Sequence, residues 1–464
     1  MAIDQKYYSC KEVISGLRKK EFSSLEITEH FLEQISANQK FNAVAFIDEE
    51  RVRISAREAD IRFAKGDQAP LLGLPLSIKD SIAVKNWPWK SGSFARENII
   101  ASEDATAVAR LRDAGAHFLC KTTVPEYTWS VETESAITGR TDNPFDPERT
   151  SGGSSGGEAV LHAVGGAPAG LGSDGLNSIR VPAHYCGTAG LRPTAGIVPE
   201  TGAWPTTRTS GLMDISTIGP MARSASDLAV LIKTIEGYDG IDPFAHNLGI
   251  QEAFGNFDEV KIGYFLSHPI APASEDTQAA IKLASNVLKT LGAKLEEIDP
   301  WPIEQSVPLA FKLMAPDGGN RVRADVAAAQ GRHSSSFAVL IEQLRSQKLD
   351  IDDYLDAVAE FKIFRSLLRS AFNTYDAIIL PVAADSAPKH LASLASDESG
   401  LSIDEYSYSF AVALAGLPSV AVPVLKGRTG LPTGVQIVCK PHFDLVAIGF
   451  ATKIQETLGA FFSI

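Results

Sequence analysis

The first 65 residues show the apolar spacing of amphipathic helices. Ser23 and Glu26 have the spacing of a capping box, which closes the N-terminus of a helix by reciprocal hydrogen bonds. Apolar residues then recur on one helical face, at Leu25, Phe31, Leu32 and Ile35. A second helix is predicted over 49–65, ending near Gly66. We therefore expect residues 1–65 to form a helical N-terminal scaffold.

From Leu71 onward, short apolar runs alternate with helical patterns and glycine turns. Residues 105–114 predict a helix that ends at Gly115, and residues 117–121 predict the strand that follows. A strand is predicted at 261–265 and a helix at 275–291, and residues 340–370 are mostly helical in pattern. Further strands are predicted at 375–381, 419–424 and 434–439. This alternation is typical of an α/β sheet.

The middle of the chain, from about 140 to 220, is rich in glycine, serine, threonine and proline. In a compact protein such a stretch more often forms a group of functional loops than a linker. We therefore search this region first for chemistry.

Composition narrows the class of protein. The chain has 464 residues, 44% of them hydrophobic, which is enough for a large core. Its net charge of −13 disfavours nucleic acid and anionic membrane surfaces as partners. A small-molecule enzyme fits this charge, and a component of a complex whose charge suits some protein partner is the alternative. Large α/β enzymes often form one domain of this length, so we expect one domain over 1–464.

Cysteine usage and the N-terminus favour the cytoplasm. The four cysteines are scattered and form no Cys-x-x-Cys pair, which predicts reduced, mostly buried thiols. The first eight residues carry charged and aromatic side chains where a signal peptide would be apolar. No stretch reaches the roughly 18 apolar residues that a membrane helix needs.

A serine nucleophile needs a base, and histidine is the usual one. His184 lies close to the glycine-rich segment, six residues after Ser178. A serine–histidine enzyme that uses His184 therefore remains one alternative.

Lysine is the other available base, although its pKa of about 10.4 in water keeps it protonated at neutral pH. Burial among apolar neighbours lowers that pKa by several units. Lys79 follows Leu74, Leu76 and Ile78, which supply such neighbours. The local sequence alone favours a strand-end lysine whose ammonium group reaches solvent. A buried, neutral Lys79 is the functional alternative.

Glycines surround the serines at 150–157 and 172–178. They allow backbone N–H groups to converge on one point, as an oxyanion requires. The first run lacks the Gly-Lys-Ser/Thr end of a phosphate-binding loop. Residues 170–175 match Gly-x-Gly-x-x-Gly, but neither a clear strand before them nor a helix after them is predicted. Spacings such as His-Glu-x-x-His are absent, so the sequence predicts neither a metal nor another cofactor.

Taken together, these segments resemble the amidase signature family. The lysine segment at 73–80 and the serine segments at 152–157 and 174–183 look like the family's central motifs. Other segments that resemble family motifs appear in the same order, at 121–126, 143–144, 190–194, 219–223, 415–423 and 431–436. The resemblance covers about 70–440, with most central motifs within 70–230, and it implies a mixed central β-sheet surrounded by α-helices.

The resemblance also implies roles for individual residues. Ser178 is expected to be the nucleophile, Ser154 the bridging serine after a cis peptide bond, and Lys79 the base. The backbone N–H groups expected to bind the oxyanion belong to Gly175, Leu176, Asn177 and Ser178. Ser155, Asp174 and Arg180 are expected to support this set.

The chain departs from the family pattern directly before the predicted nucleophile. Leu176 and Asn177 stand where the family usually has two glycines. Backbone donors survive this change if neither residue needs a positive φ, but the side chains would crowd the acyl site. Trp129 and Trp204 are candidates for a substrate pocket. Residues 300–410 match no family motif and are expected to shape specificity.

The predicted activity is hydrolysis of a small-molecule carboxamide through an acyl-enzyme on Ser178, by a monomer or homodimer. Three alternatives stay open: an amidotransferase-type glutaminase subunit that passes ammonia to a partner, an acyl transferase in a biosynthetic pathway, and a catalytically silent relative. Only the pair Leu176-Asn177 favours the silent relative.

Overall fold

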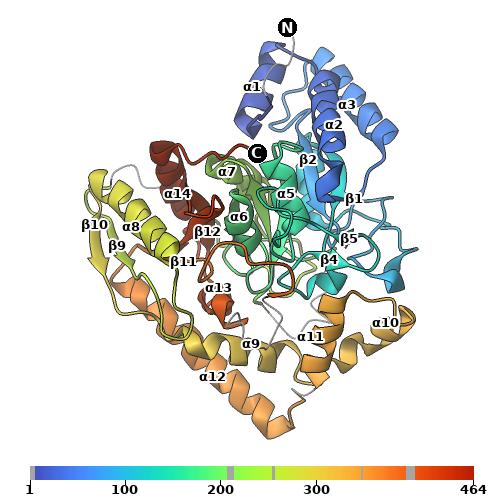
Figure 1. Ribbon diagram of the computed structural model, residues 1–464. Helices are drawn as coiled ribbons and strands as arrows, with labels where there is room; N and C mark the ends of the chain where they lie inside the picture. The colour runs from blue at the N-terminus through green and yellow to red at the C-terminus, as the bar shows by residue number, and fades with distance from the viewer. Residues whose placement is uncertain (1–5, 206–213, 253–256, 346–347, 393–402) are drawn as a thin grey trace.

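The computed structural model describes residues 6–205, 214–252, 257–345, 348–392 and 403–464. Its centre is an eleven-stranded sheet with the strand order β1-β3-β2-β6-β8-β7-β12-β13-β11-β9-β10 (Figure 1). The strands are β1 Val44–Phe46, β2 Pro75–Lys79, β3 His117–Thr122, β6 Ala169–Asp174, β7 Ala189–Arg192, β8 Thr217–Ala222, β9 Lys261–Tyr264, β10 Lys294–Glu297, β11 Ala377–Pro381, β12 Ser419–Lys426 and β13 Pro432–Cys439.

The sheet is mixed, as the resemblance implied. Strand β2 is parallel to β3 and β6, and β9 is parallel to β10 and β11. The remaining neighbours in the sheet pair antiparallel. Strands β2, β3, β8 and β13 are buried along their whole length, which accounts for their nearly continuous apolar runs. A separate two-stranded sheet joins β4 Glu134–Ser135 to β5 Gly139–Arg140.

Helices surround the sheet. They are α1 Cys10–Lys19, α2 Ser24–Ala37, α3 Glu49–Ala64, α4 Thr106–Asp113, α5 Gly156–Ala163, α6 Arg180–Cys186, α7 Ala225–Ile235, α8 Glu275–Thr290, α9 Ser306–Met314, α10 Arg323–Ala328, α11 Ser335–Arg345, α12 Ile351–Ser370, α13 Ser407–Leu414 and α14 Asp444–Leu458. Helices α4, α7, α14 and α8 form a row in which each contacts the next. Figure 1 shows α1 to α3 at the top of the molecule and α9 to α12 along its lower edge.

Most elements predicted from the sequence are present. The N-terminal part is helical, and the capping box forms as predicted, because Ser23 N donates to Glu26 Oε2 at 2.7 Å. The predicted strands correspond to β3, β9, β11, β12 and β13, and the predicted helices to α2, α3, α4 and α8. The helical region 340–370 comprises the end of α11 and all of α12, and residues 346–347 lie outside the described part.

The prediction that residues 140–220 form a group of loops is wrong in part. This segment contains α5 and α6 and the central strands β6, β7 and most of β8. Glycine stands in β6 because neighbouring groups approach it closely. A Cβ on Gly170 would lie 2.2 Å from Ser77 Oγ and 2.4 Å from Glu158 Oε2. The glycines that suggested loops therefore allow close packing at the centre of the sheet.

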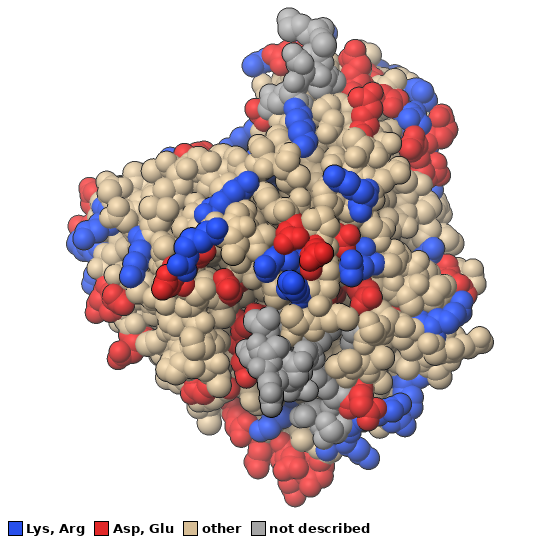
Figure 2. Space-filling view, viewed as in Figure 1, with Lys and Arg blue, Asp and Glu red and all other residues tan. Residues whose placement is uncertain are grey.

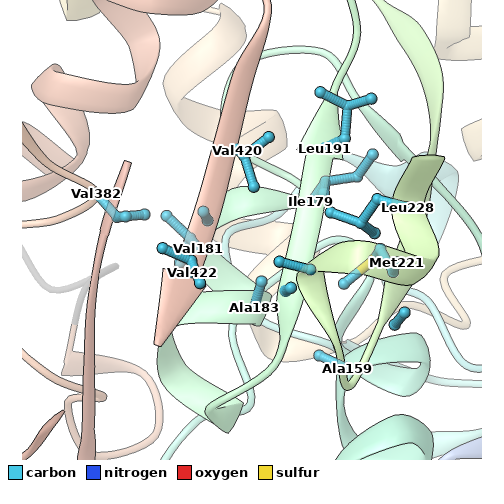
Figure 3. Close-up of a cluster of buried hydrophobic side chains, with 14 of the residues drawn as sticks. Ala159, Ile179, Val181, Ala183, Leu191, Met221, Leu228, Val382, Val420 and Val422 are labelled. Atoms are coloured by element: carbon cyan, nitrogen blue, oxygen red, sulfur yellow. The ribbon is translucent and has the colours of Figure 1, made fainter. Parts of the chain in front are cut away.

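The hydrophobic core lies between this sheet and its helices. Figure 3 shows part of it, in which Val181 and Ala183 of α6 lie near Val420 and Val422 of β12. All four cysteines are free and buried, as predicted. On the face shown in Figure 2, basic and acidic side chains are interspersed over most of the surface. No helix within the described residues is long and apolar enough to cross a membrane.

Candidate active site

The site lies at the carboxyl ends of two neighbouring parallel strands. Lys79 is the last residue of β2, and Asp174 is the last residue of β6. The segment 150–155 leads into α5, and residues 175–178 connect β6 to α6. Ligands bind at this edge in open α/β sheets because the connecting loops converge there. Parallel pairing therefore gathers segments that are up to 99 residues apart in the chain.

Lys79 is fully buried. Its Nζ lies 2.7 Å from Ser154 Oγ, 2.8 Å from Ser155 Oγ and 3.0 Å from Ser173 Oγ. The amine does not reach solvent. The interpretation of Lys79 as a strand-end lysine with a solvated ammonium group is therefore wrong. The reason lies in the tertiary structure, because β3 and β6 flank β2, and Ser154 and Ser155 before α5 and Ser173 of β6 surround the Lys79 amine.

Burial lowers the pKa of Lys79 from 10.5 to about 7. The negative charges of Asp174 and Glu158 oppose this effect but do not cancel it. A lysine with this pKa is neutral in a substantial fraction of molecules at neutral pH, and only a neutral amine accepts a proton.

The segment before α5 is closely packed. The peptide bond between Gly153 and Ser154 is cis. A Cβ on Gly153 would lie 2.7 Å from Ser130 O and 2.8 Å from Glu132 N, so only glycine fits here without a shift of the neighbouring backbone. Thr133 Oγ1 donates to Gly152 O at 2.8 Å and accepts from Gly156 N at 3.0 Å. These contacts hold the loop that presents Ser154 to Lys79.

A buried ion pair holds the segment after β6. Arg180 Nε and Nη2 donate to the two carboxylate oxygens of Asp174 at 3.0 and 3.1 Å. Arg192 Nη1 lies 3.3 Å from Asp174 Oδ1, and Ile179 N donates to Asp174 Oδ2 at 3.2 Å. Burial raises the pKa of Asp174, but the two arginines more than offset this and lower the pKa to about 2. Asp174 is therefore ionised at neutral pH.

The four N–H groups predicted to bind an oxyanion are available. Within the described part of the chain, those of Gly175, Leu176, Asn177 and Ser178 have no protein acceptor. Neither Leu176 nor Asn177 has a positive φ, so the backbone does not require glycine at these positions. Replacement of the usual glycine pair therefore keeps the backbone donors.

Ser178 lies in the same pocket as Ser154 and is 8% exposed. Its carbonyl oxygen accepts a hydrogen bond from Ser155 N at 3.1 Å, which joins the two serine-bearing segments. Among the described residues, no hydrogen bond connects the Ser178 hydroxyl with the Ser154 hydroxyl. The structure thus links Lys79 directly to Ser154 and brings Ser178 to the same pocket. Hydrogen bonds between catalytic groups are often long in a ligand-free site.

The pocket around Ser178 is mainly apolar, and both predicted tryptophans, Trp129 and Trp204, line it. Residues from 300–410 also contribute to its wall, at Phe311, Met314, Leu340, Ile403 and Phe410. The polar residues that line it, besides the serines Ser154, Ser173 and Ser178, are Thr128, Ser130, Asn177, Glu200 and Ser216. Large apolar pockets with a few polar groups are typical of small-molecule sites.

His184 does not contact this site. Its Nδ1 accepts a hydrogen bond from Gly434 N at 2.9 Å, and its Nε2 lies 3.0 Å from Asp385 O. Both ring nitrogens are therefore occupied by backbone groups, and burial lowers the pKa of the ring. This arrangement argues against a serine–histidine pair between Ser178 and His184.

Sequence reasoning did not single out three residues of the site. Ser173 contacts Lys79 through both its hydroxyl and its carbonyl oxygen. Arg192 shares the carboxylate of Asp174 with Arg180. Glu158 is buried and accepts from Ser77 at 2.6 Å and Thr122 at 2.9 Å. All three lie in or next to segments that resemble family motifs, but the sequence does not reveal these long-range contacts. The described residues contain no group of three or more side chains suited to hold a metal ion.

Comparison with known proteins gives a consistent result. The family model described as Amidase matches residues 26–445. The glutamyl-tRNA(Gln) amidotransferase A subunit of Neisseria gonorrhoeae is 30% identical to this chain, and the alignment covers 97% of each protein. A crystal structure of an amidase superposes with a TM-score of 0.84 at 28% identity, over 97% of this chain and 100% of the other.

Fatty acid amide hydrolase superposes with a TM-score of 0.87 over 98% of this chain and 86% of its own, at 22% identity, which shows a shared fold. The family model spans most of the chain and includes the segments that carry Lys79, Ser154 and Ser178. This chain therefore belongs to the amidase signature family.

Proposed function

We propose that this protein hydrolyses a small-molecule carboxamide to a carboxylate and ammonia or an amine, through an acyl-enzyme on Ser178. The contact between Lys79 Nζ and Ser154 Oγ, at 2.7 Å, carries this proposal. It connects a buried amine of lowered pKa to a hydroxyl that lies in one pocket with Ser178. Family membership adds the chemical class, because amide hydrolases are among the similar structures.

In the proposed first step, neutral Lys79 takes a proton from Ser154, and Ser154 takes one from Ser178. The Ser178 oxygen then attacks the substrate carbonyl carbon, and the carbonyl oxygen becomes an oxyanion. The free N–H groups of residues 175–178 stabilise this charge. Preorganised donors are effective here because they need no reorientation when the charge develops.

In the second step the tetrahedral intermediate breaks its C–N bond. The proton held by Lys79 returns through Ser154 to the leaving nitrogen, so the amine departs neutral. Water then attacks the Ser178 ester, and its proton follows the same relay to Lys79. Collapse of this second intermediate returns the proton from Lys79 through Ser154 to Ser178 and releases the carboxylic acid, which then loses its proton to solvent and becomes the carboxylate. No step in this scheme calls for a cofactor.

Each remaining site residue has a supporting role in the proposal. Asp174 and Arg180 fix the segment that carries the oxyanion donors, since Arg180 Nη2 also donates to Leu176 O at 2.6 Å. The Ser155 hydroxyl accepts a hydrogen bond from Lys79, and the Ser155 backbone N–H donates to the carbonyl oxygen of Ser178. Trp129 and Trp204 form part of the surface that contacts the substrate.

A glutaminase subunit is the second candidate. It is favoured by the Neisseria gonorrhoeae relative, which belongs to an amidotransferase and aligns over 97% of this chain. The catalytic steps would be the same, with glutamine as the amide and ammonia as the product. This candidate predicts selective turnover of glutamine that depends on partner subunits.

Intact-mass analysis after reaction with a fluorophosphonate tests the proposal. We expect one adduct on the wild-type protein and none on the Ser178→Ala and Lys79→Ala variants. Turnover of a panel of amides should be lost in the same variants. An adduct that persists in Ser178→Ala would place the reactive serine elsewhere, and turnover that persists in Lys79→Ala would refute the proposed base. Glutamine hydrolysis that appears only with partner subunits would favour the second candidate.

A further inference from the structure

Glu200 is a carboxylate in the wall of the pocket that contains Ser178. Its backbone is fixed, because Glu200 N donates to Asp242 Oδ2 at 2.8 Å and Ala203 N donates to Glu200 O at 2.8 Å. The side chain is partly buried, and Ser216, another pocket residue, hydrogen-bonds to it. The proposed mechanism gives this carboxylate no task.

No basic side chain in the described part of the chain forms an ion pair with Glu200. The charge of Arg192 lowers the pKa of Glu200, but the Arg192 guanidinium donates its hydrogen bonds to Asp174 and to the carbonyl oxygens of Ile215 and Ala413. Asp242 adds a second negative charge nearby. Within the described part of the chain, the Glu200 carboxylate therefore lines the pocket without an ion-pair partner.

This arrangement is unfavourable in the empty protein. Burial is the main cause that raises the pKa of Glu200, to about 7, and the charge of Asp242 acts in the same direction. A carboxylate in a mainly apolar site loses hydration, and the hydrogen bond from Ser216 does not replace the ion pair that would offset this cost. A ligand that brought a positive charge would remove this cost. A neutral apolar ligand would increase it, because it would displace the remaining water.

The rest of the pocket wall suits the apolar part of such a ligand. Trp129, Phe311 and Phe410 supply aromatic surface, and Met314 and Leu340 supply aliphatic surface. Aromatic faces also attract cations. One pocket thus combines a single negative charge with an extended apolar wall.

We propose that Glu200 binds a protonated amine of the substrate, so that the preferred amide carries a primary ammonium group on an apolar chain. This inference rests on the proposed function, because it assigns the substrate class of the same pocket. Glu200 acts as a specificity-determining residue: it pairs with the ammonium group and disfavours neutral analogues, which leave the carboxylate unpaired.

Binding of a matched ligand pair tests the inference without any turnover. Hexylammonium and 1-hexanol share a chain and differ in charge, and both can be titrated at pH 8 by the fluorescence of the pocket tryptophans. We expect hexylammonium to bind the wild-type protein at least tenfold more tightly than 1-hexanol. In Glu200→Gln the ratio should fall to about one. Equal affinity of the two ligands for the wild-type protein would overturn the inference, and so would an unchanged ratio in a folded Glu200→Gln variant.

Glu252→Gln is the matched control. Glu252 is exposed, pairs with Lys233 at 2.9 Å and does not line this pocket, so the same change of charge should leave the ligand preference intact. A fluorophosphonate adduct on Ser178, measured in parallel, tests the proposed function separately. Cation preference without an adduct would refute the acyl-enzyme and keep the cation site. An adduct without cation preference would refute the assignment of Glu200 alone.

Discussion

The reactivity of Ser178 should follow the ionisation of Lys79. The pKa of Lys79 is lowered to about 7, so about half of the molecules carry a neutral amine at pH 7. A lysine with the ordinary pKa near 10.5 would be neutral in only about one molecule in 3,000. Burial therefore increases the amount of available base about 1,500-fold at this pH.

The perturbation is a change of pH, because a base must lose its proton before it can act. The rate constant for Ser178 labelling should fall about tenfold for each pH unit below 6 and level off above pH 8. The assay measures the second-order rate of fluorophosphonate labelling by intact mass at pH 5 to 9. Circular dichroism at each pH shows that the protein stays folded. Lys79→Met, which removes the amine and keeps a similar volume, should label at a negligible rate at every pH.

Two outcomes would contradict this reasoning. A labelling rate that keeps rising tenfold per pH unit up to pH 9 would mean that Lys79 has an ordinary pKa and that its burial is not maintained in solution. A rate that does not change between pH 5 and 9 would mean that Lys79 is not the base.

Three further predictions concern the groups around Lys79. Glu158→Gln removes a negative charge that raises the pKa of Lys79, so the inflection of the labelling profile should move to lower pH. An inflection that moves to higher pH would contradict this effect of Glu158 on Lys79. The lowered pKa of Asp174, about 2 against an ordinary 3.8, stabilises the folded protein above pH 3.8, and this contribution is lost as the pH falls towards 2. Urea unfolding at pH 6 and pH 3 should therefore show a pH-dependent loss of stability that is smaller in Asp174→Asn by about 1 kcal/mol, and equal losses in both proteins would refute it. Replacement of both Leu176 and Asn177 by glycine keeps the backbone donors and removes two side chains from the pocket. The ratio of the labelling rate with a bulky fluorophosphonate to that with a small sulfonyl fluoride should therefore rise. Loss of all labelling would instead show that these side chains are needed.

The sequence predicted the elements with strong local patterns well. Strong helical periodicity and a capping box locate α2, and apolar runs next to glycine or proline locate β3 and β11. These signals are local, because they depend on a few neighbouring residues and on the two repeat lengths of helix and strand. They do not depend on which strands become neighbours.

Strands β6, β7 and β8 were harder to predict because their residues are chosen for contacts with segments that are distant in the sequence. β6 contains Gly170 and Gly172, which local propensity assigns to loops. In the folded protein each of these glycines faces a group so close that a Cβ would collide with it, such as Ser77 Oγ or Met221 Sδ. Only the packed structure shows why glycine is present in this strand.

The predicted site residues were identified by motif, whereas their chemistry depends on the fold. From the residues alone, Lys79 was better explained as a lysine that reaches solvent, and His184 remained an alternative base. The fold places Lys79 among three serine hydroxyls and binds both ring nitrogens of His184 to backbone groups. Glu200 gave no signal in the sequence, since a single glutamate in a loop is ordinary until a pocket forms around it.

What the sequence by itself determined is the family, the mixed α/β class and the candidate serines and lysine, because motif order and periodicity can be read along the chain. What only the tertiary structure decided is the ionisation of these groups and the surroundings of the pocket. The pKa values of Lys79 and Glu200 depend on burial and on charges brought from distant segments, and solvent exclusion exists only once those segments have packed together.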